Sequence, residues 1–429
     1  METIYEHIRR MNNLEGSAAD YPLMLIIYLG IFLLCLISNG MLFFSYYGKR
    51  VVWLPDQRKV IKSKFSYMAM LACTFTGVFL VGSYPSELQR TYGTWNADFF
   101  YTLGQTSIMI TAGIYSLATY KKQSSVILNS LSIIIGLSTS IPMAALTILA
   151  PINIDVNLIR MSSIIAVILV FVGLAAISVK HDLLVKYSRI NIYLFIITTI
   201  ALFTTISGID DGSIDKSKIL PFQGMIESEP WFELLSNPYW WYFEASVVSW
   251  SVFCGRFIAY CSNGYSIKDI VTLGTISLII LTVIWHLVSA ATGYTLSFSR
   301  GWIIYALTAL TMLGFAVTSL DSASKTLLVD ASRIMVDKNK HIRPNSILIY
   351  IMFGIGVVNI IILYTGSSKL FTIFFSLIFI PYLVKAAIYS IRFALGKINF
   401  SKSGTITQKE YFNITGDEPD ETNFSRIVS

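Results

Sequence analysis

The sequence is poor in charged residues. Only 13% of its 429 residues are Asp, Glu, Lys or Arg, whereas 54% are hydrophobic. A soluble domain carries roughly 25% charged residues, so this chain has too much apolar surface for a globule surrounded by water. This excludes the ordinary soluble classes, and we predict a membrane protein.

Cysteine and catalytic motifs are also scarce. The four cysteines all lie in apolar stretches without CxxC spacing, which favours small membrane-helix residues over a disulfide framework or a metal site. The sequence contains no HExxH, GxxxxGK[ST], GxSxG or GxGxxG. We therefore predict no enzyme and no organic cofactor. The excess of seven positive charges fits loops that flank membrane spans, so we predict no nucleic-acid partner.

Long apolar runs dominate the chain instead. A bilayer core about 30 Å thick requires roughly 20 apolar residues per helix. By this measure the sequence predicts an all-α polytopic fold with eleven spans: Pro22–Tyr47, Phe65–Tyr84, Phe99–Tyr120, Val126–Leu149, Leu158–Val179, Ile190–Gly208, Tyr239–Ser262, Ile270–Thr292, Gly301–Ser319, Ser346–Thr365 and Leu370–Phe393.

The basic residues lie in alternate loops, and these loops are expected to face the cytoplasm of a cell membrane. The loop 209–238 is acidic and is predicted outside, together with the N-terminal tail 1–21. The C-terminal segment 394–429 is predicted inside. Its end, from about Ser401, mixes charged and hydroxyl residues without an apolar period, so we expect it to be disordered.

Polar residues within the spans are candidate sites, because they are costly in a bilayer. Glu244 lies in an apolar span and could face a cation or water, or it could lie at the headgroup level. Arg256 could pair with an anion, but we favour an interpretation in which it snorkels to the interface. Thr318 and Ser319 offer hard oxygen donors for a small alkali cation, completed by carbonyls of a broken helix.

Two segments resemble the betaine/choline/carnitine transporter family. Residues 249–268 read SWSVFCGRFIAYCSNGYSIK, which is similar to the family pattern SWxPFxGxFxARxSxGRxIR. Residues 317–324 read VTSLDSAS, which resembles the family's VTSxDSxS. The resemblance implies a leucine-transporter-type fold in which two five-helix halves have inverted topology. These halves map to residues 65–208 and 239–393, with the helix 22–47 peripheral and the family's first helix missing.

The same resemblance implies a secondary transporter of a small zwitterionic or cationic organic solute, with alternating access and a tendency to form homotrimers. The solute would lie between the first helices of the two halves. The implied substrate-binding residues are Trp250, Glu244, Ser246, Val247 and Cys254 on one helix, and Phe75 and Thr76 on the other. The implied Na+ ligands are Thr318 and Ser319 with carbonyls near Leu71, Thr74 and Phe315; Thr139 and Ser140 mark a possible second ion site.

Departures from the family pattern leave a second function open. Of the aromatic WxWWxxW pattern only Trp250 is present, and Cys73 and Phe75 stand where the family has glycines. A degenerate relative that no longer transports, acting as a membrane sensor or partner subunit, is therefore the alternative. The retained Thr318 and Ser319 favour the transporter.

Overall fold

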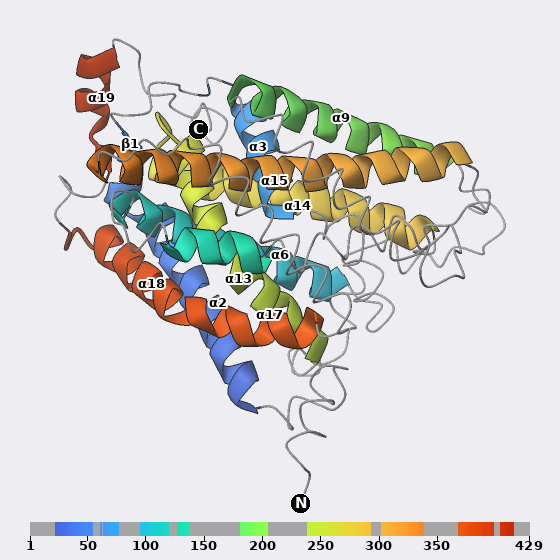
Figure 1. Cartoon of the computed structure of the whole chain (residues 1–429), viewed down its shortest axis with the longest axis horizontal. Coiled ribbons are helices and arrows are strands. Elements are labelled where there is room, and N and C mark those ends of the chain that lie inside the picture. The colour runs from blue at the N-terminus through green and yellow to red at the C-terminus, as the bar shows by residue number, and fades with distance from the viewer. Residues whose placement is uncertain are drawn as a thin grey trace, which may run out of the picture.

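We describe a computed structural model of the chain, for residues 22–54, 61, 63–76, 95–119, 127–136, 181–204, 238–292, 302–338, 368–398 and 404–415. Nearly all of these residues are helical (Figure 1). Within them, five helices are long and apolar enough to cross a membrane. The predicted all-α polytopic membrane fold is therefore confirmed, while the direction in which the termini face stays a prediction.

The helices follow most of the predicted spans. They are α2 (Pro22–Phe44), α3 (Lys64–Thr76), α6 (Trp95–Thr119), Ile127–Gly136, α9 (His181–Thr204), α13 (Pro238–Cys261), α14 (Ile267–Thr292), α15 (Trp302–Lys338), α17 (Ser368–Ser376) and α18 (Ile380–Ala394). Short elements are η2 (Tyr46–Lys49), β1 (Val51–Val52), η5 (Leu377–Phe379), β2 (Thr405–Ile406) and α19 (Gln408–Thr415). The predicted spans Leu158–Val179 and Ser346–Thr365 lie outside the described residues.

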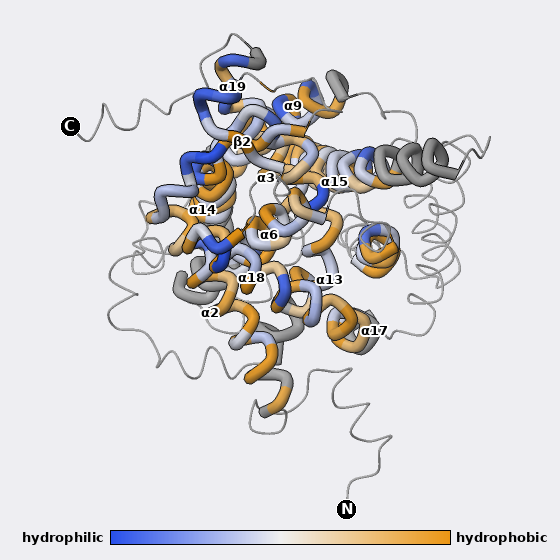
Figure 2. The backbone as a smooth tube through the Cα atoms, turned by 90° about the vertical axis from the view of Figure 1, so that its left-hand side faces the viewer, coloured by the Kyte–Doolittle hydropathy of each residue, from blue (hydrophilic) through white to orange (hydrophobic). Residues whose placement is uncertain are grey.

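Side chains are distributed as expected for a protein surrounded by lipid. Large apolar residues point outward along the length of α2 and α9, such as Ile26 and Ile37 on α2 and Ile197 on α9. Hydroxyl and amide side chains are buried between the helices, among them Thr111 and Asn191. Figure 2 shows the apolar outer segments of α2 and α17 and the more hydrophilic end of the bundle near α19. A bilayer supplies the apolar surroundings that these exposed faces require.

Helix α3 lies among α9, α14 and α15, and its residues 66–75 are almost all buried. The largest interface between helices joins α6 to α13. Glycines permit this close approach, because a Cβ atom at Gly255 would lie 2.6 Å from the backbone carbon of Ala112. Small residues at such crossings are typical of packing between membrane helices.

Two predicted spans differ from the helices that form. α15 has 37 residues and continues far beyond the predicted end at Ser319. The apolar pattern fades there, but no Gly or Pro occurs before Pro344, so nothing stops the helix. The last predicted span consists of α17, the 3-10 turn η5 and α18, and the break lies at Pro381 in the first turn of α18.

Part of the C-terminal segment is folded, contrary to the expectation of disorder. β2 pairs antiparallel with β1, which also accepts a hydrogen bond from Gly264 in the loop between α13 and α14. Arg50 donates to Thr405 through Nε (3.1 Å, to Oγ1) and Nη2 (3.0 Å, to the carbonyl). Trp53 packs edge-on against Tyr411 of α19 at 5.6 Å. The polar composition did not predict that this segment folds, because the segment is held by hydrogen bonds and one aromatic contact and not by an apolar face.

The crossing of α6 and α13 predicts a stability effect. Gly255→Ala is expected to destabilise the protein by about 1–3 kcal/mol, since the new methyl group overlaps the Ala112 backbone. Gly30→Ala on α2 is the matched control, because a Cβ at Gly30 meets nothing within 4 Å. Thermal unfolding in one detergent measures both, and an equal effect of the two variants would contradict the proposed close approach.

The docked C-terminal segment predicts a pH dependence. Hydrogen bonds from the Thr407 N–H and hydroxyl lower the pKa of Glu410, and Arg50 adds to the effect. The ionised cap therefore stabilises docking above the ordinary carboxylate value, and this contribution is lost as the pH falls through the lowered pKa. We expect amide exchange in 404–415, corrected for intrinsic rates, to accelerate on acidification. Glu410→Gln should exchange faster at neutral pH; equal protection in the two proteins would refute the capping role.

Candidate functional site

The last turn of α3 directs backbone carbonyls at three other helices. Cys73 O accepts a hydrogen bond from Ser319 Oγ on α15 at 3.0 Å. Thr74 O lies 4.0 Å from Cys254 Sγ on α13, and Phe75 O accepts from the Gln105 amide on α6. A backbone carbonyl has two lone pairs and can accept a bond from another helix in addition to any bond within its own helix. The carbonyls of Cys73, Thr74 and Phe75 therefore connect α3 to three neighbouring helices.

Hydroxyl oxygens of α15 face the same turn. Thr74 Oγ1 and Ser322 Oγ are 2.9 Å apart. Thr318 Oγ1 accepts from the Asn191 amide of α9 and donates to Gly314 O at 2.7 Å. With Ser319 and Cys73 O, these atoms form a buried group of neutral oxygens between α3, α9 and α15, which we call the α3–α15 oxygen cluster.

Two further hydroxyls lie nearby in the chain and are buried without a hydrogen-bond partner among the described residues. They are Ser188 Oγ on α9 and Ser324 Oγ on α15. The Ser188 carbonyl lies 3.7 Å from Cys73 Sγ, so Ser188 is adjacent to the last turn of α3. A buried polar group normally has a partner, so the Ser188 hydroxyl is a candidate member of the same site.

The chemistry of this cluster suits a small alkali cation. Carbonyl and hydroxyl oxygens are hard, neutral ligands of the kind preferred by such ions, in contrast to thiolate or imidazole. In the described part of the chain no three His, Cys, Asp or Glu side chains gather as a metal site. The donor set is therefore unlike that of a zinc or iron centre.

The structure brings together part of the predicted Na+ ligand set. Thr318, Ser319 and Thr74 belong to the cluster, but the carbonyl that Ser319 contacts is that of Cys73. Leu71 is buried one turn earlier in α3, and the Phe315 ring packs edge-on against Phe195. The predicted second ion site, Thr139 and Ser140, lies outside the described residues.

Four of the predicted substrate-binding residues of α13 are buried, namely Ser246, Val247, Trp250 and Cys254. Trp250 faces the helix Ile127–Gly136. Its indole N–H donates to Gly136 O at 2.9 Å, and a Cβ at Gly136 would overlap the ring. Ser246 and Val247 lie a turn earlier. Cys254, a turn later, points at α3. This stripe of α13 thus lies between Ile127–Gly136 and α3.

Phe75 is fully buried at the end of α3. The backbone of Thr76 ends α3, and that of Glu244 belongs to α13. The side chains of these last two residues lie outside the described set, so their predicted roles stay predictions.

One hydroxyl of the neighbouring helix enters the backbone of α13. Ser132 Oγ donates to Ser249 O at 2.5 Å and accepts from Phe253 N at 3.4 Å. These two backbone groups are partners in a regular α-helix. A side chain inserted between them weakens the helix at this turn. Sequence reasoning missed Ser132 and Gly136, although two small residues spaced by four are a recognisable packing pattern.

Arg256 is a correction to the prediction that it snorkels. Its side chain is only 1% exposed, and it is the largest fully buried side chain in the described part of the chain. It lies close enough to Tyr382 on α18 for an electrostatic interaction. Arg256 follows Gly255, the residue at which α13 meets α6 most closely, and the packing around this part of α13 buries it.

No model of a known protein family matches this sequence, and no curated protein matches it. A solved structure described as the substrate-bound outward-open state of a Na+-coupled sialic acid symporter is similar at 12% identity, over 87% of this chain and 86% of that chain, with a TM-score of 0.47. The substrate and ion in that description are those of that protein. The class that the helices of this chain define is an all-α polytopic membrane protein.

The polar seam between α9 and α15 offers a matched test. Thr198 Oγ1 lies 2.8 Å from Thr311 Oγ1 across this interface, whereas the hydroxyl of Thr199 bonds only within α9, to Phe195 O. Thr198→Val should destabilise the protein by about 0.6 kcal/mol, the average for such bonds between membrane helices. Thr199→Val should change stability less. Denaturation in mixed detergent compares the two; a larger loss for Thr199→Val would contradict the assignment.

Proposed function

We propose that the chain is a secondary active transporter. It couples the movement of Na+ to the movement of a small organic solute by alternating access. The observation that carries this proposal is the α3–α15 oxygen cluster, in which the Cys73 carbonyl and the Thr74 hydroxyl of α3 face the hydroxyls of Ser319 and Ser322 on α15. Transporters typically coordinate coupling ions with unwound backbone near the bilayer midplane.

The same oxygen atoms of the cluster can either form hydrogen bonds with one another or coordinate a cation. A hydroxyl has one proton and two lone pairs. When Ser319 donates to Cys73 O, both oxygens are satisfied; when the proton turns away, both oxygens can accept a cation. The Asn191 amide holds Thr318 in place through Oγ1, so the position of this hydroxyl does not depend on the ion.

The packing supports the proposed pair of inverted halves. The first helix of the first half, α3, packs on α14, the second helix of the second half. Correspondingly, α13 packs on α6, the second helix of the first half. In each case the first helix of one half packs on the second helix of the other half. This reciprocal packing is expected for two halves related by a pseudo-two-fold axis in the membrane plane.

The solute is proposed to be a small zwitterion or organic cation of the betaine, choline or carnitine type. The stripe of α13 that holds Ser246, Trp250 and Cys254 lies beside the end of α3 with Phe75, and it is the proposed binding surface. The hydrogen bond from Trp250 to Gly136 holds the indole against its neighbour. Because this hydrogen bond holds the indole in place, it favours the alternative function, a relative that retains the ion site and does not transport.

Sodium binding is tested by thermal stability of the detergent-purified chain in Na+ and in K+. A ligand at 100 times its dissociation constant adds about 2.7 kcal/mol of stability. We expect stabilisation by Na+ alone, lost in Ser319→Ala and in Thr318→Ala. Thr308→Ala is the matched control, because its buried hydroxyl bonds only to Ile304 O and lies about 15 Å along α15 from Thr318.

Transport is tested by uptake of betaine, choline, carnitine and amino acids into proteoliposomes under an inward Na+ gradient. Uptake that needs Na+ and is lost in Ser319→Ala supports the transporter. Uptake unchanged by removal of Na+ would remove the coupling, and Na+ stabilisation without uptake of any compound would favour the non-transporting alternative. The molecular mass of the same purified protein tests the predicted homotrimer.

A further inference from the structure

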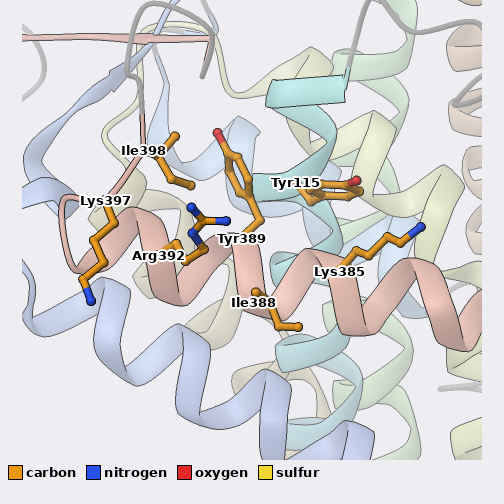
Figure 3. A pocket seen from close by; sticks show the side chains of 7 residues that line it. All are labelled: Tyr115, Lys385, Ile388, Tyr389, Arg392, Lys397 and Ile398. Atoms are coloured by element: carbon orange, nitrogen blue, oxygen red, sulfur yellow. The ribbon is translucent and has the colours of Figure 1, made fainter.

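A cavity of about 430 Å³ lies where the end of α6 meets the end of α18. Three cationic side chains line it, Lys385, Arg392 and Lys397, together with the rings of Tyr115 and Tyr389. None of its lining residues is acidic. Figure 3 shows the Tyr389 ring between Arg392 on one side and Tyr115 on the other. This pocket plays no part in the proposed ion or solute site.

The local sequence creates this concentration of positive charge. Lys385, Tyr389 and Arg392 are spaced by four and three residues, so they share one face of α18. After α18 the chain turns back through Gly396, whose φ is +71°. Lys397 N then donates to Arg392 O at 2.8 Å and Gly396 N to Phe393 O at 2.9 Å, which is a Schellman cap. The cap returns Lys397 towards Arg392.

The helices that pack on α18 place no carboxylate near these charges in the described part of the chain. Residues 338–409 contain Lys and Arg but no Asp or Glu. Of the helices packed on α18, α2 has no charged residue, and the only acidic residue of α6 is Asp98, about 26 Å along the helix from Tyr115. The only acidic residue of α13 is Glu244, in the half of that helix remote from Arg256. The cations therefore lack an acidic partner from these elements.

The Tyr389 hydroxyl is buried and makes no hydrogen bond with the described residues. Its ring is fixed by stacking on Phe393 and by an edge contact with Tyr115 at 5.6 Å. Beside it, Ile388 is 47% exposed, and Phe374 and Ile378 are exposed apolar residues earlier in the same span. The pocket thus combines cations, an unused hydroxyl donor and an apolar path at the end of a membrane span.

We propose that this pocket binds the headgroup of an anionic phospholipid. The phosphate accepts hydrogen bonds from Arg392, Lys397 and the Tyr389 hydroxyl, and an acyl chain follows Ile388. Basic pockets between transmembrane helices are known to bind anionic headgroups. A phosphate oxygen accepts strongly from guanidinium and ammonium donors. The position at the end of the apolar span Thr372–Ala394 favours a lipid over a free anion, since the pocket opens where headgroups lie.

The test is a native mass spectrometry titration of the detergent-purified full chain with phosphatidylglycerol and with phosphatidylcholine of the same acyl chains. We expect tighter binding of phosphatidylglycerol. The double variant Arg392→Gln, Lys397→Gln should weaken it about tenfold or more, from the loss of two cations. Tyr389→Phe should weaken it as well, since it removes only the hydroxyl.

The matched control is Lys186→Gln, Arg189→Gln, which removes the same charge from exposed positions of α9, on the opposite side of the molecule in Figure 1. This variant should bind phosphatidylglycerol as the unchanged chain does. An equal loss in both double variants, or equal binding of the two lipids, would overturn the proposal. Competition by inorganic phosphate or glycerol phosphate as effective as that of the lipid would assign the pocket to a free phosphate instead. Thermal unfolding without lipid verifies that each variant is folded.

Discussion

Backbone carbonyls of α3 face side-chain donors from three other helices, and these contacts hold the centre of the molecule together. Water is absent from the bilayer core, so each unsatisfied carbonyl costs several kcal/mol. The last turn of α3 receives donors from α15 and α6 and a thiol from α13. Helices far apart in the sequence are thereby fixed around one turn. One of these oxygens, Cys73 O, also belongs to the α3–α15 oxygen cluster.

The sequence predicted the helices well, because length and hydropathy determine them in a bilayer. α13 lies within one residue of its predicted bounds at both ends. The prediction failed where a polar segment is helical. α15 continues as a helix beyond its apolar part, and α19 forms in a polar segment through a capping box and the contact of Tyr411 with Trp53. Hydropathy reports the surroundings of a residue and not its backbone conformation.

The candidate site was predictable only in part, for a related reason. Thr318 and Ser319 were predicted by residue type and by resemblance, and Ser319 faces α3. Thr74 was predicted for its carbonyl, whereas the atom that faces α15 is its hydroxyl. Their partners Asn191 and Ser132 come from other helices, and their roles depend on contacts that no local pattern encodes. Arg256 illustrates the limit: a cation in an apolar span reads as a snorkelling residue until the packing of α6 on α13 encloses it.

The positions where side chains form hydrogen bonds with backbone groups also determine which helix movements cost little free energy. Regular helices packed through glycine contacts, such as α6 and α13 at Gly255, cannot separate without losing close packing. By contrast, displacing α3 from α15 exchanges hydroxyl contacts of Ser319 and Ser322, and such groups can turn to new acceptors. An ion that bound these oxygens would stabilise one arrangement of α3 and α15 over another. A ligand shifts an equilibrium only by its differential affinity for the two states, and the oxygen cluster lies on a seam where that difference can arise without breaking a helix.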